Sequence, residues 1–282
     1  SVTKTLASIS ARAPIAGRTS PLEWDATLDV TDETAAYGRL VSRAVTRLRP
    51  VRVLDVGCGA GLPTIEAALA GAPSVIGIDV VARNVFLARM HARRAGVHGR
   101  VSCQAASWED VLRGDFYPGK VDLVVSNPPY LPNGTALAVD GGPDGARMLH
   151  SILNGLPETT RGGALLFGSL SDPVSVLEHI TSIGFEIMEL RGLSVPFGAY
   201  ASSPRTLASV KQARLSRKAW FCDNPSAPLA PYSYLTLGVI ACRREGTRAR
   251  SEDIVKQVPA LLDRYQRFGP ASLEEHPWLG QL

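Results

Sequence analysis

The chain has 282 residues, of which 45% are hydrophobic and 20% are charged, and its formal net charge is +4. This composition predicts a packed globular protein of one or two domains and excludes a largely disordered chain. The small positive excess is compatible with an acidic or nucleic-acid partner but does not require one. No apolar run is long enough to cross a bilayer and no export signal opens the chain, so we expect a cytoplasmic protein without a membrane partner. The cysteines show no metal-ligand spacing, so we expect reduced thiols and no bound metal at Cys58, Cys103, Cys222 and Cys242.

Residues 1–48 are expected to form an N-terminal extension that acts as a substrate lid. Prolines and glycines interrupt its first half, and no strong strand pattern appears before residue 50. A helix is predicted over 33–48, with Thr31 or Asp32 as its N-cap, because short polar side chains there accept hydrogen bonds from free backbone amides. The apolar stripe of this helix is expected at Ala35, Leu40, Val41 and Ala44.

Between residues 49 and 242, apolar runs alternate with helical segments, which predicts repeated βαβ units. Such units build a doubly wound α/β fold on a mostly parallel sheet, and ligands bind at the carboxyl edge of such a sheet. Strands are predicted at 51–56, 74–80, 100–104, 121–125, 164–167, 185–190 and 233–242, and helices at 62–70, 83–95, 145–156 and 174–183.

Two segments depart from this alternation. Residues 193–230 form a proline-rich insertion before the last strand, with a short basic helix expected at 210–220. Residues 243–282 form a charged tail with a helix expected at 252–267. We therefore predict three parts: the extension, an α/β domain over 49–242, and a helical tail.

The first predicted strand is followed by a glycine-rich turn. Asp55 lies two residues before Gly57, and Gly59 and Gly61 follow at alternate positions. Glycine permits the tight backbone path and the close approach to a ligand that such a turn needs. The spacing resembles motif I of the class I S-adenosylmethionine-dependent methyltransferases. The resemblance implies a Rossmann-like, seven-stranded methyltransferase sheet, S-adenosylmethionine as the cofactor, and cofactor contacts from these residues.

Further cofactor-binding residues are expected where the next two strands end. Asp79 ends the second strand, beside Val80, and its carboxylate is expected to accept hydrogen bonds from both ribose hydroxyls. A capping role for Asp79 at the following helix is compatible with this assignment. After the third strand, the resemblance implies an acidic residue for the adenine amino group, but this chain has Ala106, Ser107 and Trp108. We assign Ser107 and Trp108 to the adenine site, with ordinary core packing as the alternative for Trp108.

The fourth predicted strand leads directly into Asn127-Pro128-Pro129-Tyr130. Prolines fix the backbone and lack N–H donors, so the Asn127 side-chain oxygen and the Pro128 carbonyl can accept hydrogen bonds from a flat amino group. Tyr130 can stack on that group, and the main expected source of rate is positioning. The tetrapeptide resembles the [DNS]-P-P-[YFW] motif of methyltransferases that act on planar amide or amino nitrogens, which implies catalytic roles for Asn127, Pro128 and Tyr130 and cofactor contact from Asn127.

A second resemblance concerns the segments that flank this loop. Residues 141–145 (Gly-Gly-Pro-Asp-Gly) are similar to the GG-x-DG segment of the release-factor glutamine N5-methyltransferases. Residues 32–34, with Tyr37 after them, resemble the element that closes over the cofactor in that family. We therefore assign Thr34 to the cofactor site and the following side chains to the substrate site: Glu33, Tyr37, Tyr130 and Asp144.

The departures from that family lie in the parts that would bind substrate. About 30 residues precede the closing element, too few for the helical N-terminal domain of those enzymes, and the insertion and tail have no counterpart. The first reading is therefore N-methylation of a small molecule, such as an amino acid side chain, a guanidino group or an amide in specialised metabolism. The N-terminal segment and the insertion would form a lid that excludes water.

Two other acceptors stay open. One is a glutamine of a protein such as a release factor, and the other is an amino group of RNA or DNA. The nucleic-acid reading draws on a basic stretch that could follow phosphates, with a solvated helix face as the alternative. A binding protein that has lost the chemistry is the reading outside enzymes, and the intact glycine turn argues against it. The sequence predicts no particular oligomeric state. The basic stretch comprises Lys211, Arg214, Arg217 and Lys218, beside Trp220 and Phe221.

Overall fold

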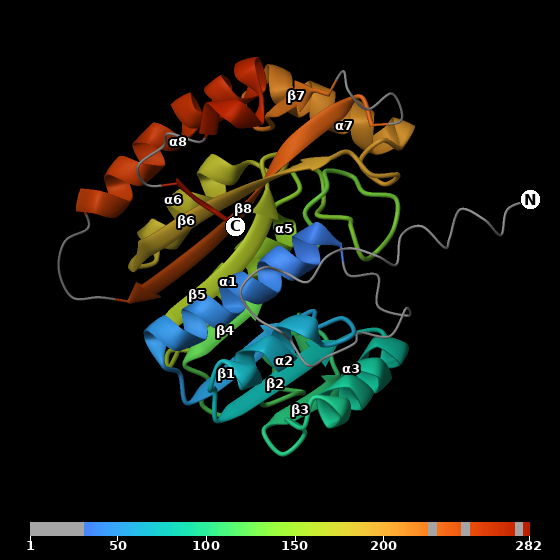
Figure 1. The fold of residues 1–282 in the computed structure, drawn as a ribbon, viewed down its shortest axis with the longest axis vertical. Helices are drawn as coiled ribbons and strands as arrows, with labels where there is room; N and C mark the ends of the chain where they lie inside the picture. The colour runs from blue at the N-terminus through green and yellow to red at the C-terminus, as the bar shows by residue number, and fades with distance from the viewer. Residues whose placement is uncertain (1–30, 225–229, 244–248, 274–278) are drawn as a thin grey trace, which may run out of the picture.

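The computed structural model describes residues 31–224, 230–243, 249–273 and 279–282, so most of the expected N-terminal lid, residues 1–30, lies outside the described part. Helices and strands alternate along most of the chain (Figure 1). In chain order the elements are α1 (Asp32–Leu48), β1 (Arg52–Val56), α2 (Leu62–Leu69), β2 (Ser74–Asp79), α3 (Ala82–Arg94), β3 (Val101–Ala105), α4 (Trp108–Arg113), β4 (Leu123–Ser126), α5 (Arg147–Asn154), β5 (Gly162–Gly168), α6 (Pro173–Ser182), β6 (Phe185–Pro196), α7 (Pro204–Leu215), β7 (Phe221–Asp223), β8 (Tyr232–Arg243), α8 (Ala249–Phe268), a 3₁₀ turn (Pro270–Leu273) and β9 (Leu279–Gln281).

One mixed sheet organises the molecule, with the strand order β3-β2-β1-β4-β5-β8-β6-β9. The strands from β3 to β5 pair in parallel, whereas β8 is antiparallel to both β5 and β6. The predicted doubly wound sheet of seven strands is confirmed. Two short strands extend it among the described residues: β9 pairs with β6, and β7 pairs with β8.

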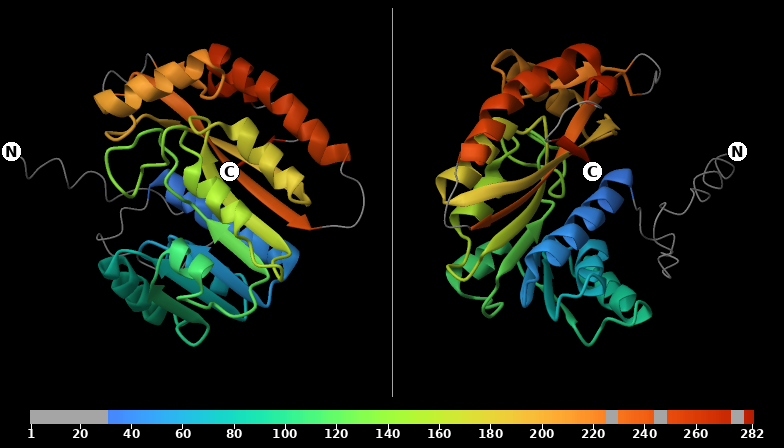
Figure 2. Two further views of the ribbon diagram at one scale, coloured as in Figure 1. Left: turned by 180° about the vertical axis from the view of Figure 1, so that it is seen from behind. Right: turned by 60° about the vertical axis from the view of Figure 1, so that its left-hand side comes forward.

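Helices cover both faces of the sheet (Figure 2). One core cluster joins α1, α2 and α3 to one face, and another joins α4, α5, α6 and α8 to the opposite face. The β4 strand is fully buried, which is why it reads as a continuous apolar run in the sequence. The described residues contain no helix that is both long and apolar enough to cross a membrane.

Helix α1 begins where the sequence predicts. The Thr31 side chain is the N-cap and accepts a hydrogen bond from the Thr34 backbone amide. Leu40, Val41 and Ala44 are fully buried, as expected for the apolar stripe, whereas Ala35 is only half-buried. The helix packs along α2, β5 and β8, so its first turn reaches the carboxyl edge of the sheet.

The insertion differs from its prediction. The basic helix was expected at 210–220, but α7 runs over Pro204–Leu215. Ser203 caps its first turn and Pro204 occupies its first position, which is a strong start signal because proline fixes the backbone angle and needs no amide donor there. The start of the insertion is not irregular either, because β6 continues to Pro196.

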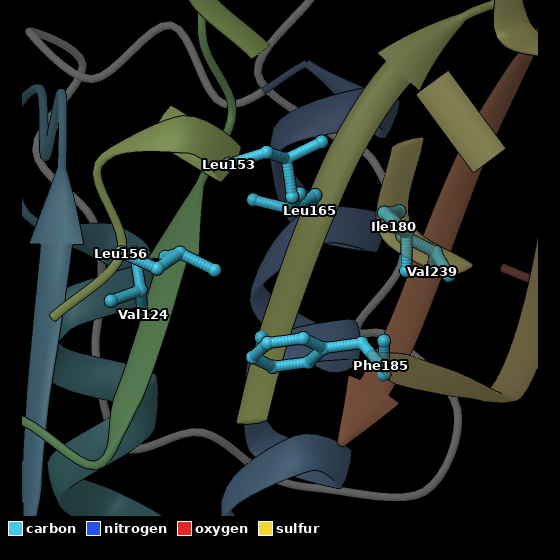
Figure 3. A pocket seen from close by; sticks show the side chains of 9 residues that line it. Val124, Leu153, Leu156, Leu165, Ile180, Phe185 and Val239 are labelled. Atoms are coloured by element: carbon cyan, nitrogen blue, oxygen red, sulfur yellow. The ribbon is translucent and has the colours of Figure 1, made fainter. Parts of the chain in front are cut away.

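A small cavity lies between the sheet and the α5–α6 layer (Figure 3). Its volume is about 10 Å³ and its lining is entirely apolar, including Leu153, Leu165, Ile180 and Phe185. A water molecule needs polar partners as well as space, so this cavity is dry and belongs to the core rather than to a binding site.

Candidate active site

The strand register brings the predicted site residues to one edge of the sheet. Val56 of β1 pairs with Ser126 of β4, so Gly57 and Asn127, the residues that follow them, are neighbours. The Ser126 hydroxyl donates to the Val56 carbonyl at 2.7 Å and fixes this junction. The crossovers change direction between β1 and β4, and open α/β sheets bind ligands outside the carboxyl ends at such a point.

The three glycines of the turn have different roles. Gly57, Gly59 and Gly61 all have positive φ angles, of 77°, 54° and 96°. A Cβ atom added at Gly57 or Gly59 would meet nothing within 4 Å, so the turn borders open space on that side. A Cβ at Gly61 would lie 2.8 Å from the Cβ of Ala88. Gly61 therefore permits close packing of the turn against α3, and its predicted contact with the cofactor stays a prediction.

Asp55 lies beneath the turn and is fully buried. One carboxylate oxygen accepts a hydrogen bond from the Thr64 hydroxyl at 2.6 Å, and the other has no partner within the described ranges. Burial raises the pKa of Asp55 to about 7, and the nearby charge of Asp79 adds to the shift while the Thr64 bond opposes it. A buried oxygen without a partner is costly, so it suits a site that receives a cation or a donor from a ligand.

Asp79 lies at the end of β2, as predicted, and organises the backbone around it. One oxygen accepts from the Gly59 amide at 2.9 Å, and the other accepts from the Val81 amide at 2.8 Å. These bonds tie the glycine turn to the start of α3. Val80, beside Asp79, is 58% exposed at the same edge. The hydrogen bonds to ribose that we expect of Asp79 remain a proposal.

The adenine assignment of Trp108 needs correction. Its indole is only 1% exposed and packs in the core beneath α5, so it offers no open face for stacking. Ser107 caps α4: its side chain accepts from the Asp110 amide, and its own amide and hydroxyl donate to the Asp110 carboxylate. The cap turns residue 108 into the first helical position and directs the indole inward. The Ser107 hydroxyl is thereby committed to the helix.

Asn127 has the environment that an acceptor for a substrate donor needs. Its side-chain oxygen is buried and has no hydrogen-bond partner among the described residues. The next two residues are prolines, so neither supplies an amide donor. Buried polar atoms are nearly always paired in proteins, and an exception of this kind points to a group that arrives with a ligand.

Tyr130 is held by two distant parts of the chain. Its hydroxyl donates to Glu33 of α1 and lies 2.8 Å from the Tyr234 hydroxyl of β8. Thr236, also on β8, donates to the same Glu33 oxygen at 2.9 Å. Burial raises the pKa of Glu33, although both hydrogen bonds oppose the shift. The Glu33 carboxylate thus holds the Tyr130 hydroxyl, and its predicted contact with substrate stays a prediction.

The remaining predicted residues are divided between the two halves of the site. Tyr37 is buried one turn after Glu33, and burial together with the charges of Asp55 and Cys58 raises its pKa. It therefore lies with the cofactor turn rather than with the catalytic loop. Thr34 bonds to Thr31 in the first turn of α1. Asp144 is exposed and accepts from the Ala146 amide, so it shapes the turn before α5.

The glycine segment 141–145 packs against the chain at the end of the catalytic loop and bonds to the residues that follow it. The Gly141 amide donates to the Leu131 carbonyl at 2.9 Å, and the Asn133 amide donates to the Gly142 carbonyl at 2.8 Å. A Cβ at Gly145 would lie 2.5 Å from the Tyr130 carbonyl oxygen. Only glycine fits here, so the segment contributes the shape of the loop rather than contacts to a ligand.

The chain is similar to known methyltransferases. A family described as a methyltransferase domain matches residues 49–188. A Methanocaldococcus jannaschii protein, provisionally assigned as a protein N5-glutamine methyltransferase, is 30% identical over 58% of this chain and 86% of its own length. A release factor glutamine methyltransferase of Thermosynechococcus vestitus is 30% identical over 50% of this chain, and the chain spans only 54% of it. A Pyrococcus horikoshii structure described as that of an RNA methyltransferase, itself a provisional assignment, covers 75% of this chain and 86% of its own, with a TM-score of 0.49 and 14% identity.

The chain belongs to the class I S-adenosylmethionine-dependent methyltransferases. Within that class it is similar to the protein glutamine N5-methyltransferases, and S-adenosylmethionine is its cofactor. The site fits this group, because the open side of the glycine turn and the unpartnered Asp55 oxygen suit a cationic ligand. In the part of the chain that the structure describes, no cluster of His, Cys, Asp or Glu could hold a metal ion.

Sequence reasoning missed four side chains that support the site. Tyr234 and Thr236 hold Tyr130 and Glu33, Thr64 bonds to Asp55, and Asn84 donates to Asp79 at 3.3 Å. The alternation of polar and apolar residues in β8 places Tyr234 and Thr236 on one face, but nothing local indicates which element that face meets.

Proposed function

We propose that this methyltransferase transfers a methyl group to the side-chain amide nitrogen of a glutamine in a protein. The observation that carries the proposal is the buried, unpartnered oxygen of Asn127 beside Gly57, where the cofactor turn and the catalytic loop meet. The similarity to chains named for protein glutamine N5-methylation supports an amide acceptor. These relatives favour a protein over the small molecule that we expected first.

The roles of the residues follow from the chemistry of an amide NH₂ group. Asn127 accepts one N–H of the amide, and the Pro128 carbonyl accepts the other, so the amide plane is fixed. Tyr130, held at its hydroxyl, supplies an aromatic face for the flat amide. When bound, S-adenosylmethionine supplies an electrophilic methyl carbon on a positively charged sulfur. Fixed oxygen acceptors stabilise the positive charge that develops on the nitrogen, which then loses one proton.

The division of the chain into working parts is also a proposal. Residues 49–242 would carry the reaction, and the first turn of α1 would close the site, because Glu33 reaches the catalytic loop and Tyr37 reaches the cofactor turn. Asp79 would hold the ribose hydroxyls, as its position at the end of β2 suggests.

The test is a methyl-transfer assay with tritiated cofactor against three pools: glutamine-containing peptides and release factor, total RNA and DNA, and small amines and amino acids. We expect label in the glutamine pool, and mass spectrometry should place one methyl group on the glutamine side chain. The matched control is the same peptide with asparagine in place of glutamine, which should stay unlabelled. Label confined to nucleic acid or to small molecules would overturn the proposal.

A further inference from the structure

The insertion forms a second concave surface beside the catalytic loop. The groove lies between α7 and the β7–β8 pair, has a volume of about 460 Å³, and is lined by residues that include Lys211, Arg214, Phe221 and Tyr232. The Lys211 ammonium lies 5.5 Å from the centre of the Tyr232 ring, and the Arg214 guanidinium lies 4.5 Å from that of Phe221. These aromatic rings hold both cations at the rim of the groove.

The groove and the catalytic loop are parts of one packed unit. The Asn133 side chain donates to the Ser209 hydroxyl of α7 at 3.0 Å, and the Thr206 hydroxyl of α7 donates to the Asn133 carbonyl at 3.3 Å. Figure 1 shows α7 at the same end of the sheet as the loop that follows β4. These bonds fix the position of α7, and so of the groove, relative to the catalytic loop.

The separation between the two sites can be bounded from the aromatic residues that connect them. The rings of Tyr130 and Tyr234 are 6.3 Å apart. Tyr232 is two residues before Tyr234 on β8, on the same face, which adds about 7 Å. The Tyr130 ring therefore lies within roughly 13 Å of the Tyr232 ring in a straight line. The buried Phe197 and Tyr234 rings fill the space between them, so a peptide that passes around this cluster needs about four residues or more.

The charges of the groove favour an anionic ligand. Neither Lys211 nor Arg214 has an ion pair with the described part of the chain, and Asp223 is the acidic residue in the lining. By contrast, the other two cations of the basic stretch are neutralised by partners outside the groove. Arg217 pairs with Asp263 at 2.8 Å and Lys218 pairs with Asp172 at 3.4 Å.

We propose that this groove binds an acidic side chain of the polypeptide substrate, about four residues or more from the target glutamine; this inference rests on the proposed function. A carboxylate suits the pair formed by Lys211 and Arg214, because guanidinium groups bind carboxylates through two parallel hydrogen bonds. Single-stranded nucleic acid fits less well. Phe221 is only 1% exposed and Lys211 already covers Tyr232, so the groove offers no open ring on which a base can stack.

The experiment uses the full chain and a series of glutamine peptides that carry one glutamate at successive distances on either side of the glutamine. Binding is measured by fluorescence anisotropy on the glutamine peptides in the absence of S-adenosylmethionine, so it does not depend on methylation. We expect the tightest binding with the glutamate about four positions or more from the glutamine, and weaker binding at shorter spacings. The double variant Lys211→Glu/Arg214→Glu should weaken that peptide about tenfold and leave cofactor affinity unchanged.

The matched control reverses two exposed cations at the opposite edge of the sheet, Arg100→Glu/Lys120→Glu, and should bind the peptide as the wild type does. Equal weakening of peptide binding in both variants, or binding that does not depend on the position of the glutamate, would overturn the proposal that the groove binds an acidic side chain. Preferential binding of single-stranded RNA by the Lys211/Arg214 surface would overturn it as well. A peptide that binds as expected but is never methylated when S-adenosylmethionine is added would overturn the proposed function alone.

Discussion

Replacing Glu33 with alanine should disable the catalytic loop without unfolding the protein. Glu33 accepts hydrogen bonds from the hydroxyls of Tyr130 and Thr236. A hydrogen bond to a charged group contributes about 1.5–3 kcal/mol, but removing the carboxylate also relieves the cost of burying it, which its raised pKa reflects. We therefore expect Glu33→Ala to lower the free energy of unfolding by about 2 kcal/mol. The Tyr130 ring loses its anchor, so kcat should fall at least about tenfold.

The assay is a double-mutant cycle with Tyr130→Phe, which keeps the ring and removes the hydroxyl. Urea unfolding should give a coupling energy of about 1–2 kcal/mol between the two positions, and the double variant should turn over no more slowly than Glu33→Ala alone. Tyr265→Phe is the matched control, because it also removes a buried tyrosine hydroxyl, which is 2.7 Å from Ser194. It should lower stability without changing kcat. Additive effects at Glu33 and Tyr130, or wild-type kcat in Glu33→Ala, would show that Glu33 does not hold the Tyr130 ring in place for turnover.

The cofactor turn gives two further predictions. The raised pKa of Asp55, about 7, means that this residue stabilises the fold while it is protonated, a contribution that is lost as pH rises from about 4 through about 7. The free protein should accordingly be easier to unfold in urea at pH 8 than at pH 5. A cationic cofactor should bind about tenfold more tightly at pH 8 than at pH 6, and calorimetry at pH 6 should show that binding releases a proton. Asp55→Asn should abolish the change in cofactor binding and reduce the change in stability, because Glu33, whose pKa is also raised, acts in the same direction. A flat pH profile in the wild type would contradict the assignment. Gly61→Ala should cost about 3 kcal/mol of stability through its clash with Ala88, whereas Gly57→Ala should mainly weaken cofactor binding, and the reverse ranking would count against these roles.

The sheet and the cofactor turn could be predicted from the sequence because their signals are local. Buried parallel strands give continuous apolar runs, as β4 does, and the carboxyl edge follows from the handedness of βαβ connections. The strand pattern alone therefore predicts that Asp55, Asp79 and Asn127 lie at one edge of the sheet. The start of α7 was also readable in principle, since Ser203-Pro204 is a cap followed by proline.

Contacts between distant segments could not be predicted in this way. Glu33 and Thr236 are 203 positions apart, and no periodicity in α1 indicates that its first turn meets β8. Trp108 was assigned to the adenine site by its position after β3, but the capping box of α4 directs its side chain into the core. Gly61 packs closely against Ala88, whereas Gly57 borders open space. The spacing of the glycines in the sequence does not encode this difference.

Comparing turnover with cofactor affinity in Asn127→Ala tests whether the Asn127 side-chain oxygen orients the substrate amide. Turnover on the acceptor of the wild type should fall about a hundredfold or more, while the dissociation constant for S-adenosylmethionine stays within about twofold of the wild type. Asn154→Ala, which removes a side-chain amide at the end of α5 that bonds to His179, is the matched control and should change neither value. Retained turnover in Asn127→Ala, or a parallel loss of turnover and cofactor binding, would show that Asn127 does not orient the substrate amide.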